Sequence, residues 1–147
     1  MTAVRHDVHH PIDVQVCGPG AGSTDRTLPF IYDRDQPYEV TILIAGHGRV
    51  ERIVLSRAEL DSGRYKTVQR PGADTMTFPD GYDRRWMYIG IRPGCGHFAM
   101  LKLAVVDVSA FLDPTYDLVP AGTEADHQLV PDDAQMDAAL AAWLGAA

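Results

Sequence analysis

Six histidines are the first candidates for metal binding or acid–base chemistry in this sequence. None shows the H-E-x-x-H pattern or the paired Cys/His spacing with which proteins usually hold zinc. Three crowd the N-terminus and three stand alone, at His6, His9, His10, His47, His97 and His127. We therefore expect neither a metal nor another cofactor.

Acidic pairs are plentiful, but they stand where carboxylates are normally solvated or cap a helix. Paired carboxylates do acid–base work only where burial separates their pKa values. The G-x-S-x-G pattern of a nucleophile elbow is missing, and neither Cys17 nor Cys95 has a base beside it. The acidic pairs are Asp33/Asp35, Asp80/Asp83 and Asp132/Asp133. The sequence predicts a protein that is not an enzyme, with both thiols reduced.

A glycine-rich segment, Gly18-Pro-Gly-Ala-Gly22, follows a predicted strand, as phosphate-binding loops do. It lacks the last glycine of the dinucleotide fingerprint. Pro29, which is expected to break a strand, also stands where the helix of that fingerprint should start. The Lys-Ser/Thr of a P-loop is also missing. A flexible connection over residues 18–24 is the better interpretation.

Arg84-Arg85-Trp86 is the one basic and aromatic cluster, with tyrosines nearby in sequence. On a sheet, such residues could stack bases and contact phosphates. Alternatively, Trp86 is a core aromatic beside solvated arginines. The net charge of −7 and the pI near 5.2 disfavour nucleic acid as a partner. Single-stranded nucleic-acid binding is retained as the alternative function.

The 147 residues fit one domain, with 46% hydrophobic and 22% charged residues. No apolar run approaches the roughly 20 residues of a transmembrane helix, and no secretory signal is visible. Residues 49–102 carry ten basic and six acidic side chains, whereas residues 103–147 carry eight acidic and none that is basic. One interpretation is that the acidic segment packs over the basic segment or simply stays solvated. The other is that the two segments form a polar surface for a partner.

Hydrophobic alternation predicts strands over residues 12–16, 28–32, 38–45, 50–55, 75–78, 86–91 and 98–106. Residues 1–10 are expected to be a disordered tail, and residues 11–147 a single domain. Gly46-His-Gly48 predicts a hairpin turn. Together with three helices, this pattern gives an α+β fold with an antiparallel sheet.

Three helices are expected. Ser56 opens the first with a capping box in which Glu59 reaches back, and Gly63 ends it in a left-handed conformation. A second begins near Ser109, with Pro114 tolerated only in its first turn. The third opens at Pro131, and its apolar stripe should dock on the domain. That stripe is Met136, Leu140, Trp143 and Leu144.

A series of short motifs runs in order along most of the chain. It begins with Tyr32-Asp33-x-x-x-Pro37-Tyr38-x-Val40 and continues through Val50-Glu51, Arg57-x-x-Leu60-x-x-Gly63 and Pro71-Gly72-x-Asp74. The longest is Phe111-Leu112-x-x-Thr115-x-x-x-Val119-Pro120-x-Gly122-Thr123-Glu124. In order and spacing, these motifs resemble the SsgA-like proteins, regulators of sporulation-specific cell division in filamentous actinobacteria.

The resemblance implies a β-rich protein with packed helices, similar in fold to the whirly-type single-stranded nucleic-acid binders and assembled as a homotrimer. It also implies a non-enzymatic adaptor, cytoplasmic and at the cell septum. Such a protein localises or recruits division machinery such as the tubulin-like FtsZ, or binds SsgA-like paralogues. No membrane insertion is expected.

The motif residues have a structural interpretation, which the sequence favours, and a partner-surface interpretation, which stays open. Asp33 and Pro37 would shape a tight turn between strands. Pro120 and Gly122 would fix the exit from a helix, and Glu124 would pair with an arginine of the middle segment. The candidate partner surface comprises Tyr32, Asp33, Pro37, Tyr38, Pro120, Gly122, Thr123 and Glu124, and the candidate basic-aromatic patch comprises Arg84, Arg85 and Trp86.

Overall fold

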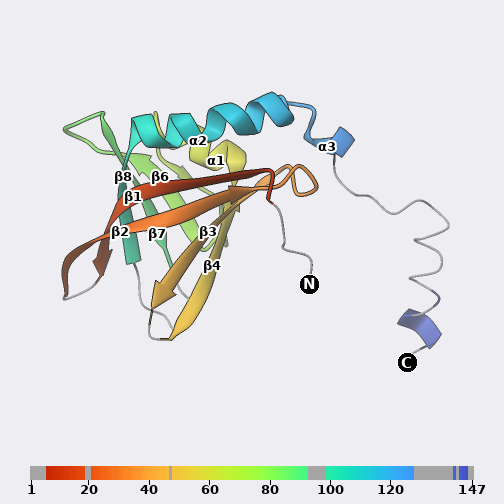
Figure 1. Cartoon of the computed structure of the whole chain (residues 1–147), viewed down its shortest axis with the longest axis horizontal. Coiled ribbons are helices and arrows are strands. Elements are labelled where there is room, and N and C mark those ends of the chain that lie inside the picture. The colour runs from red at the N-terminus through yellow and green to blue at the C-terminus, as the bar shows by residue number, and fades with distance from the viewer. Residues whose placement is uncertain are drawn as a thin grey trace.

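The described part of the chain forms one antiparallel sheet of eight strands with three helices, as the computed structural model shows (Figure 1). The structure describes residues 6–18, 21–46, 48–92, 99–127, 141 and 143–145. The strands are β1 (Val8–Gly18), β2 (Ala21–Tyr32), β3 (Glu39–Gly46), β4 (Arg49–Ser56), β5 (Val68–Gln69), β6 (Thr75–Pro79), β7 (Trp86–Ile91) and β8 (Ala99–Ala104). The helices are α1 (Arg57–Ser62), α2 (Val105–Leu118) and α3 (Glu124–His127). The expected α+β class is confirmed.

The strands lie in the order β4-β3-β2-β1-β8-β7-β6-β5, so the sheet has β4 at one edge and β5 at the other. It curls into a half-barrel, and α2 lies across it with α1 alongside (Figure 1). Helix α2 contacts β1, β8 and α1. The helices therefore cover the inner face of the sheet.

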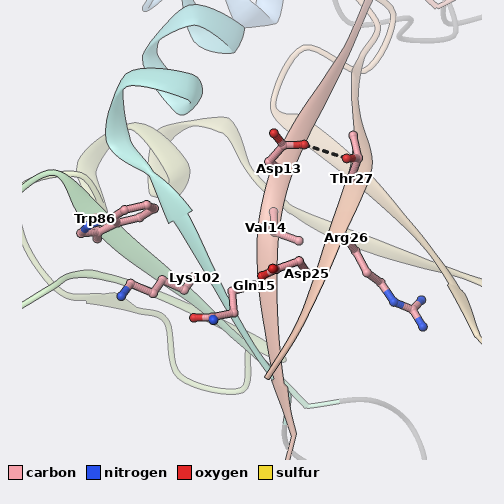
Figure 2. Close-up of a pocket in the computed structure, with 8 residues that line it drawn as sticks. All are labelled: Asp13, Val14, Gln15, Asp25, Arg26, Thr27, Trp86 and Lys102. Carbon is pink, nitrogen blue, oxygen red and sulfur yellow. Dashed lines mark hydrogen bonds between the residues drawn. The ribbon is translucent and has the colours of Figure 1, made fainter. Parts of the chain in front are cut away.

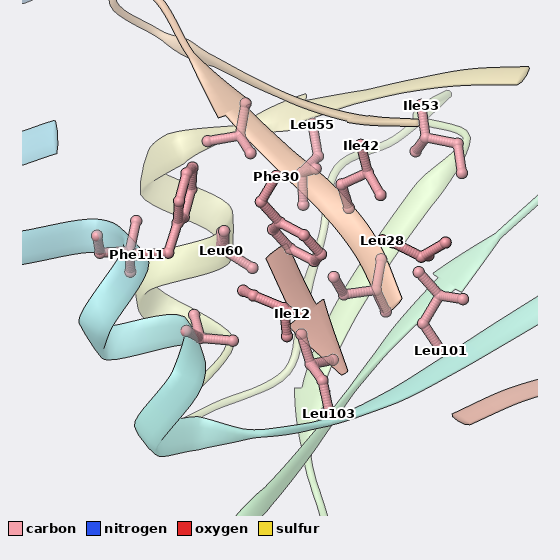
Figure 3. Close-up of a cluster of buried hydrophobic side chains, with 14 of the residues drawn as sticks. Ile12, Leu28, Phe30, Ile42, Ile53, Leu55, Leu60, Leu101, Leu103 and Phe111 are labelled. Atoms are coloured by element: carbon pink, nitrogen blue, oxygen red, sulfur yellow. The ribbon is translucent and has the colours of Figure 1, made fainter. Parts of the chain in front are cut away.

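Alternation along the strands sends one set of side chains into the half-barrel. In β1, Ile12 and Val14 are buried, whereas Asp13 between them is exposed. Phe30 of β2 meets Phe111 of α2 edge to face, with ring centroids 5.7 Å apart. Figure 3 shows these side chains meeting in one interior, whose members include Ile12, Leu28, Phe30, Ile42, Leu55, Leu60, Leu101, Leu103 and Phe111.

The expected N-terminal tail is wrong for residues 8–10, because β1 begins at Val8. Val8 is buried and lies opposite Tyr32 of β2. Just before it, the carboxylate of Asp7 accepts hydrogen bonds from the backbone and guanidinium of Arg34. Contacts with Arg34, which is distant in sequence, thus fix the start of β1, although the polar composition of this segment suggests a disordered terminus.

The expected flexible loop over residues 18–24 is also shorter than predicted, and Pro29 does not break a strand. Strand β2 starts at Ala21 and runs through Pro29, which lies opposite Pro11 of β1. Neither proline can donate a ladder hydrogen bond, so this pair must be of the non-hydrogen-bonded kind that alternates along an antiparallel pair. The two prolines are therefore compatible with a long hairpin.

Helix α2 starts earlier than expected, because β8 ends at Ala104 and Val105 is already helical. The buried face of α2, namely Val108, Phe111, Leu112 and Thr115, has helical spacing and sets its register. Pro114 consequently lies well inside the helix. The carbonyl that it leaves without its helical partner belongs to Ala110, at an exposed position.

Helix α1 confirms one half of the capping prediction. The Ser56 hydroxyl accepts from the Glu59 backbone N–H at 3.3 Å, but the Glu59 side chain is buried and pairs with Arg70. Gly63 has φ −62°, so the left-handed ending is wrong. A Cβ at Gly63 would lie 2.4 Å from Cβ of Thr77 in β6. Gly63 is needed for close packing of the chain against the sheet.

The predicted C-terminal helix falls mostly outside the described residues. Trp143 and Leu144 are exposed, so the expected docking of these two side chains on the domain is wrong. Elsewhere the β3–β4 hairpin agrees with the prediction, since Gly46 lies opposite Arg49.

Candidate functional site

Arg57 is a fully buried charged residue at the start of α1, with 1% of the residue's surface exposed. Its backbone N–H continues the β3–β4 ladder by donating to the Tyr38 carbonyl at 2.8 Å. This bond directs the side chain inward, between α1 and the end of α2. A buried guanidinium is tolerated only where partners satisfy its N–H groups.

Three acceptors bind the guanidinium of Arg57. Nη1 donates to the carbonyls of Thr115 at 3.0 Å and Val119 at 2.8 Å. These carbonyls lie at the C-terminal end of α2, where the helix dipole favours a cation. Nη2 donates to Oε1 of Glu124 at 2.9 Å. The prediction that Glu124 pairs with an arginine of the middle segment is thus confirmed.

Two aromatic rings flank the same guanidinium. Its carbon lies 4.2 Å from the ring centroid of Tyr116 and 5.1 Å from that of Tyr32. The Tyr116 hydroxyl donates to Asp61 at 2.5 Å, and burial together with this carboxylate raises the pKa of Tyr116. The ring of Tyr116 therefore stays neutral and fixed beside the cation.

The β2–β3 turn is held by the first motif, as predicted. The Tyr32 hydroxyl donates to the Pro37 carbonyl at 3.0 Å, and both residues are buried. The Asp33 carbonyl accepts from the Gln36 N–H at 3.0 Å, which closes the turn. Burial raises the pKa of Tyr32. Of this motif, Tyr38 is the residue left clearly exposed.

The segment after α2 is held by the last motif, also as predicted. Thr123 donates its N–H to the Pro120 carbonyl at 3.1 Å, and Gly122 adopts φ +87°, which favours glycine. The Gly122 N–H donates to Oε2 of Glu124 at 2.9 Å. Burial alone would raise the pKa of Glu124, but hydrogen bonds from backbone N–H groups and Arg57 outweigh it and lower the pKa.

We call Arg57, Tyr32, Thr115, Tyr116, Val119 and Glu124 the Arg57 cluster. It joins α1, the end of α2, the β2–β3 turn and the Pro120–Glu124 turn; in Figure 1 the two turns lie near the end of α2, and α1 lies alongside α2. Because the polar groups of Arg57 and Glu124 bind each other and backbone atoms, the cluster positions two turns. Tyr38 and Pro120 are exposed beside it.

The sequence pointed to Arg57 only indirectly. The residue stands in the Arg-x-x-Leu-x-x-Gly motif, but nothing in that motif says that its side chain is buried. Thr115 contributes its backbone carbonyl, and such a role cannot be inferred from the residue type. Tyr116 lay in a segment expected to be helical, without a partner assigned to it.

The basic-aromatic patch is more balanced in charge than its sequence suggests. Arg85 pairs with Asp83 at 2.8 Å and lowers the pKa of that carboxyl to about 2. Arg84 is exposed and donates to the Tyr65 carbonyl at 3.3 Å. Trp86 is half-buried on the outer face of the sheet, so it is not a core aromatic. Lys102 lies 4.9 Å from the ring centroid of Trp86.

A shallow hollow of about 600 Å³ opens on this outer face, across β2, β1, β8 and β7 (Figure 2). Figure 2 shows Trp86 and Lys102 on one side and Asp13 hydrogen-bonded to Thr27 on the other. Its side chains combine both charges with one aromatic ring.

Within the described ranges, no group of three His, Cys, Asp or Glu side chains is arranged to hold a metal ion. His6, for example, binds the carboxylate of Asp33 at 3.0 Å. In the same ranges, no helix has the length and apolar character needed to cross a membrane.

Comparison with known proteins gives a family and a fold. The sequence model of the family described as "Streptomyces sporulation and cell division protein, SsgA" matches residues 27–124, about two thirds of the chain. No curated protein matches the chain in sequence.

Two solved structures have a similar fold. One carries the description "Mutations in SsgB correlate to longitudinal cell division during sporulation of Streptomyces coelicolor". It has a TM-score of 0.71 and 22% identity, covering 82% of this chain and 94% of that one. The other is an SsgA-like sporulation-specific cell division protein from Thermobifida fusca YX-ER1. Its TM-score is 0.70 at 23% identity, covering 91% of this chain and 93% of that one.

Proposed function

The chain belongs to the SsgA family of sporulation and cell division proteins, and from this membership we propose that it is a non-enzymatic adaptor of cell division. In this role it localises or recruits septal machinery of the FtsZ type, or binds SsgA-like paralogues, through protein contacts at the septum. The family match carries the proposal, because it spans both motifs that meet at the Arg57 cluster.

The Arg57 cluster supports an adaptor in physical terms. Its buried cation fixes two turns that each present an exposed side chain, Tyr38 at 47% exposure and Pro120. A surface whose backbone is fixed before binding loses less conformational entropy when a partner docks. We therefore place the principal partner surface at this end of the molecule.

Affinity capture tests this proposal. The full chain, tagged and expressed from its own promoter, should retain division proteins when captured from cells that are forming septa. Tyr38→Ala should reduce that retention, and Tyr82→Ala, at an exposed tyrosine remote in sequence, should leave it unchanged. Recovery of no division protein from dividing cells would contradict the proposal.

We further propose that the chain assembles as a homotrimer of whirly-like architecture. Size-exclusion chromatography with light scattering should then give about three times the 16.1 kDa of one chain. A mass near 16.1 kDa would contradict the trimer and leave the adaptor proposal standing.

Single-stranded nucleic-acid binding is the second candidate, and one arrangement favours it. On the outer face, Lys102 lies opposite Tyr88, whose ring stacks on Phe78 with centroids 5.2 Å apart. Such a row can stack bases beside a cation. Binding of a single-stranded oligonucleotide that weakens with salt and on Trp86→Ala would support it, and no binding at low salt would remove it.

A further inference from the structure

Strand β4 is one of the two edge strands of the sheet, and within the described residues it pairs with β3 alone. Its register runs from Ser56 opposite Glu39 to Arg49 opposite Gly46. The Arg57 N–H, one residue farther on, donates to Tyr38. Because hydrogen-bonded and non-hydrogen-bonded pairs alternate, Val50, Arg52 and Val54 direct their backbone N–H and C=O groups away from β3.

The side chains of β4 divide between the two faces. Ile53 and Leu55 point into the core, whereas Val50 is 66% exposed and Val54 is 39% exposed. An eight-residue edge with free backbone groups and exposed β-branched side chains is a template for pairing with a further strand. Arg49, Glu51 and Arg52 place charges along this edge, but in the described part of the chain no further strand pairs with it.

A hollow of about 430 Å³ lies beside this edge, between β4 and the facing ends of β6 and β7. Thr75 and Ile91, which are paired across β6 and β7, supply buried side chains to its lining. A second hollow, of about 340 Å³, shares Asp74 and Arg92 with the first. The two hollows form a seam along the open side of the half-barrel.

The charges of the seam select among ligands. Arg52 and Arg92 line the same hollow, and neither forms an ion pair with a described residue. One carboxylate between the two guanidiniums would form charge-assisted hydrogen bonds. Glu51 and Asp74 also line the hollow and would repel a polyanion. The seam therefore suits a peptide with a single acid better than a nucleic acid.

We propose that β4 is a strand-addition site for an extended peptide of a partner protein, in which β-branched residues flank one Asp or Glu that lies between Arg52 and Arg92. The peptide backbone binds the free edge of β4, and its alternate side chains fill the seam and cover Val50 and Val54. This inference rests on the proposed adaptor function and specifies the chemistry of one partner contact.

Selection from a displayed library of random dodecapeptides, with the full-length chain as target, tests the specificity. Enriched peptides should alternate β-branched and polar residues around one acid. Selection on the Arg52→Glu variant should replace that acid by Lys or Arg. Enrichment of peptides without alternation, or of the same acidic peptides on both targets, would overturn the proposal.

Binding of one enriched peptide tests the role of the backbone edge. Val54→Pro removes an N–H that faces the free edge and none that pairs with β3. It should raise the Kd about tenfold or more, because one backbone hydrogen bond is lost and the ring obstructs the edge. Val54→Thr keeps the N–H and the branched shape, and should change the Kd less than about twofold. Equal binding by the proline variant, with its fold verified by circular dichroism, would overturn the proposal; if that variant unfolds, the Arg52→Glu selection decides.

Two measurements separate this proposal from its alternatives. If β4 pairs instead with a second copy of this chain, Val54→Pro lowers the mass measured by light scattering and the proposal fails. If wild type and Val54→Pro both localise to septa with the same captured partners, the adaptor function stands and the strand-addition site fails. If the edge binds its peptides but the wild type is not at septa, only the adaptor function fails.

Discussion

Nη2 of Arg57 lies 2.9 Å from Oε1 of Glu124, although 67 positions separate the two residues in the sequence. The pair joins the first turn of α1 to the start of α3. It is asymmetric, since the arginine side chain is 2% exposed and the glutamate side chain 18%. Two sequence motifs of this chain, both within the range that the family model matches, thus meet at one buried cation, which fixes the turns on both sides of it.

Replacing Arg57 with methionine should destabilise the fold strongly. Arg57→Met leaves Oε1 of Glu124 and the carbonyls of Thr115 and Val119 without the N–H groups that Arg57 donates to them. Breaking one side of a buried pair costs about 3 to 5 kcal/mol. Urea unfolding measures the loss. The matched change Arg34→Met removes an exposed pair with Asp7 and should cost far less, because water screens exposed charges. Equal losses would contradict the role given to Arg57.

Glu124 should make stability depend on pH in the acidic range. Because the pKa of Glu124 is lower in the folded state than its ordinary value of 4.5, the unfolded chain binds the proton more tightly. The stabilisation is therefore present at pH 7 and is lost as the pH falls below about 4.5. The difference in unfolding free energy between wild type and Glu124→Gln should shrink over that range. A difference that is constant from pH 7 to pH 3 would show that the charge of Glu124 contributes nothing.

Gly63 should tolerate no side chain. Its Cβ would meet Oγ1 of Thr77 at 2.3 Å, and this hydroxyl already donates to the Glu59 carbonyl at 2.9 Å. Gly63→Ala should cost about 1 to 3 kcal/mol through overpacking. Gly63→Asn should cost at least as much, measured by thermal unfolding. A left-handed helix end would instead accept Asn, so a well-tolerated Asn would contradict the packing explanation.

The β2–β3 turn should depend on one hydroxyl. Tyr32→Phe removes the buried hydrogen bond to the Pro37 carbonyl and should cost about 1 kcal/mol. Tyr38→Phe changes an exposed ring and should cost nothing measurable. Denaturant unfolding of both variants checks the difference. Identical midpoints for the two would mean that the hydroxyl of Tyr32 does not hold the turn.

The sequence predicted the sheet better than the ends of its elements. Alternation in the segment from Ile12 to Val16 identified β1, because one face of that strand is buried and the other solvated. The start at Val8 was missed, because contacts between Asp7 and Arg34 hold it, and these lie 27 positions apart. Likewise Val105 and Val106 have strand-like composition, but the buried face of α2 places them in the helix.

The site was predictable in its turns and not in its centre. Asp33, Pro37 and Gly122 are residue types with local conformational preferences, so their turns can be inferred from the sequence. The burial of Arg57 depends on backbone carbonyls of α2 and on the tyrosine rings that flank it. These are tertiary features, which no local pattern encodes. The close contact between Gly63 and Thr77 was missed for the same reason.

Localisation in living cells tests the central claim most directly. A fluorescent fusion of the full chain, expressed at its native level in sporulating cells, should form foci or bands at division septa that coincide with the FtsZ ring. The Tyr38→Ala fusion should lose part of that signal while remaining folded. Even fluorescence throughout the cell at the time of septation, with the fusion intact, would contradict the claim that this protein acts at the septum.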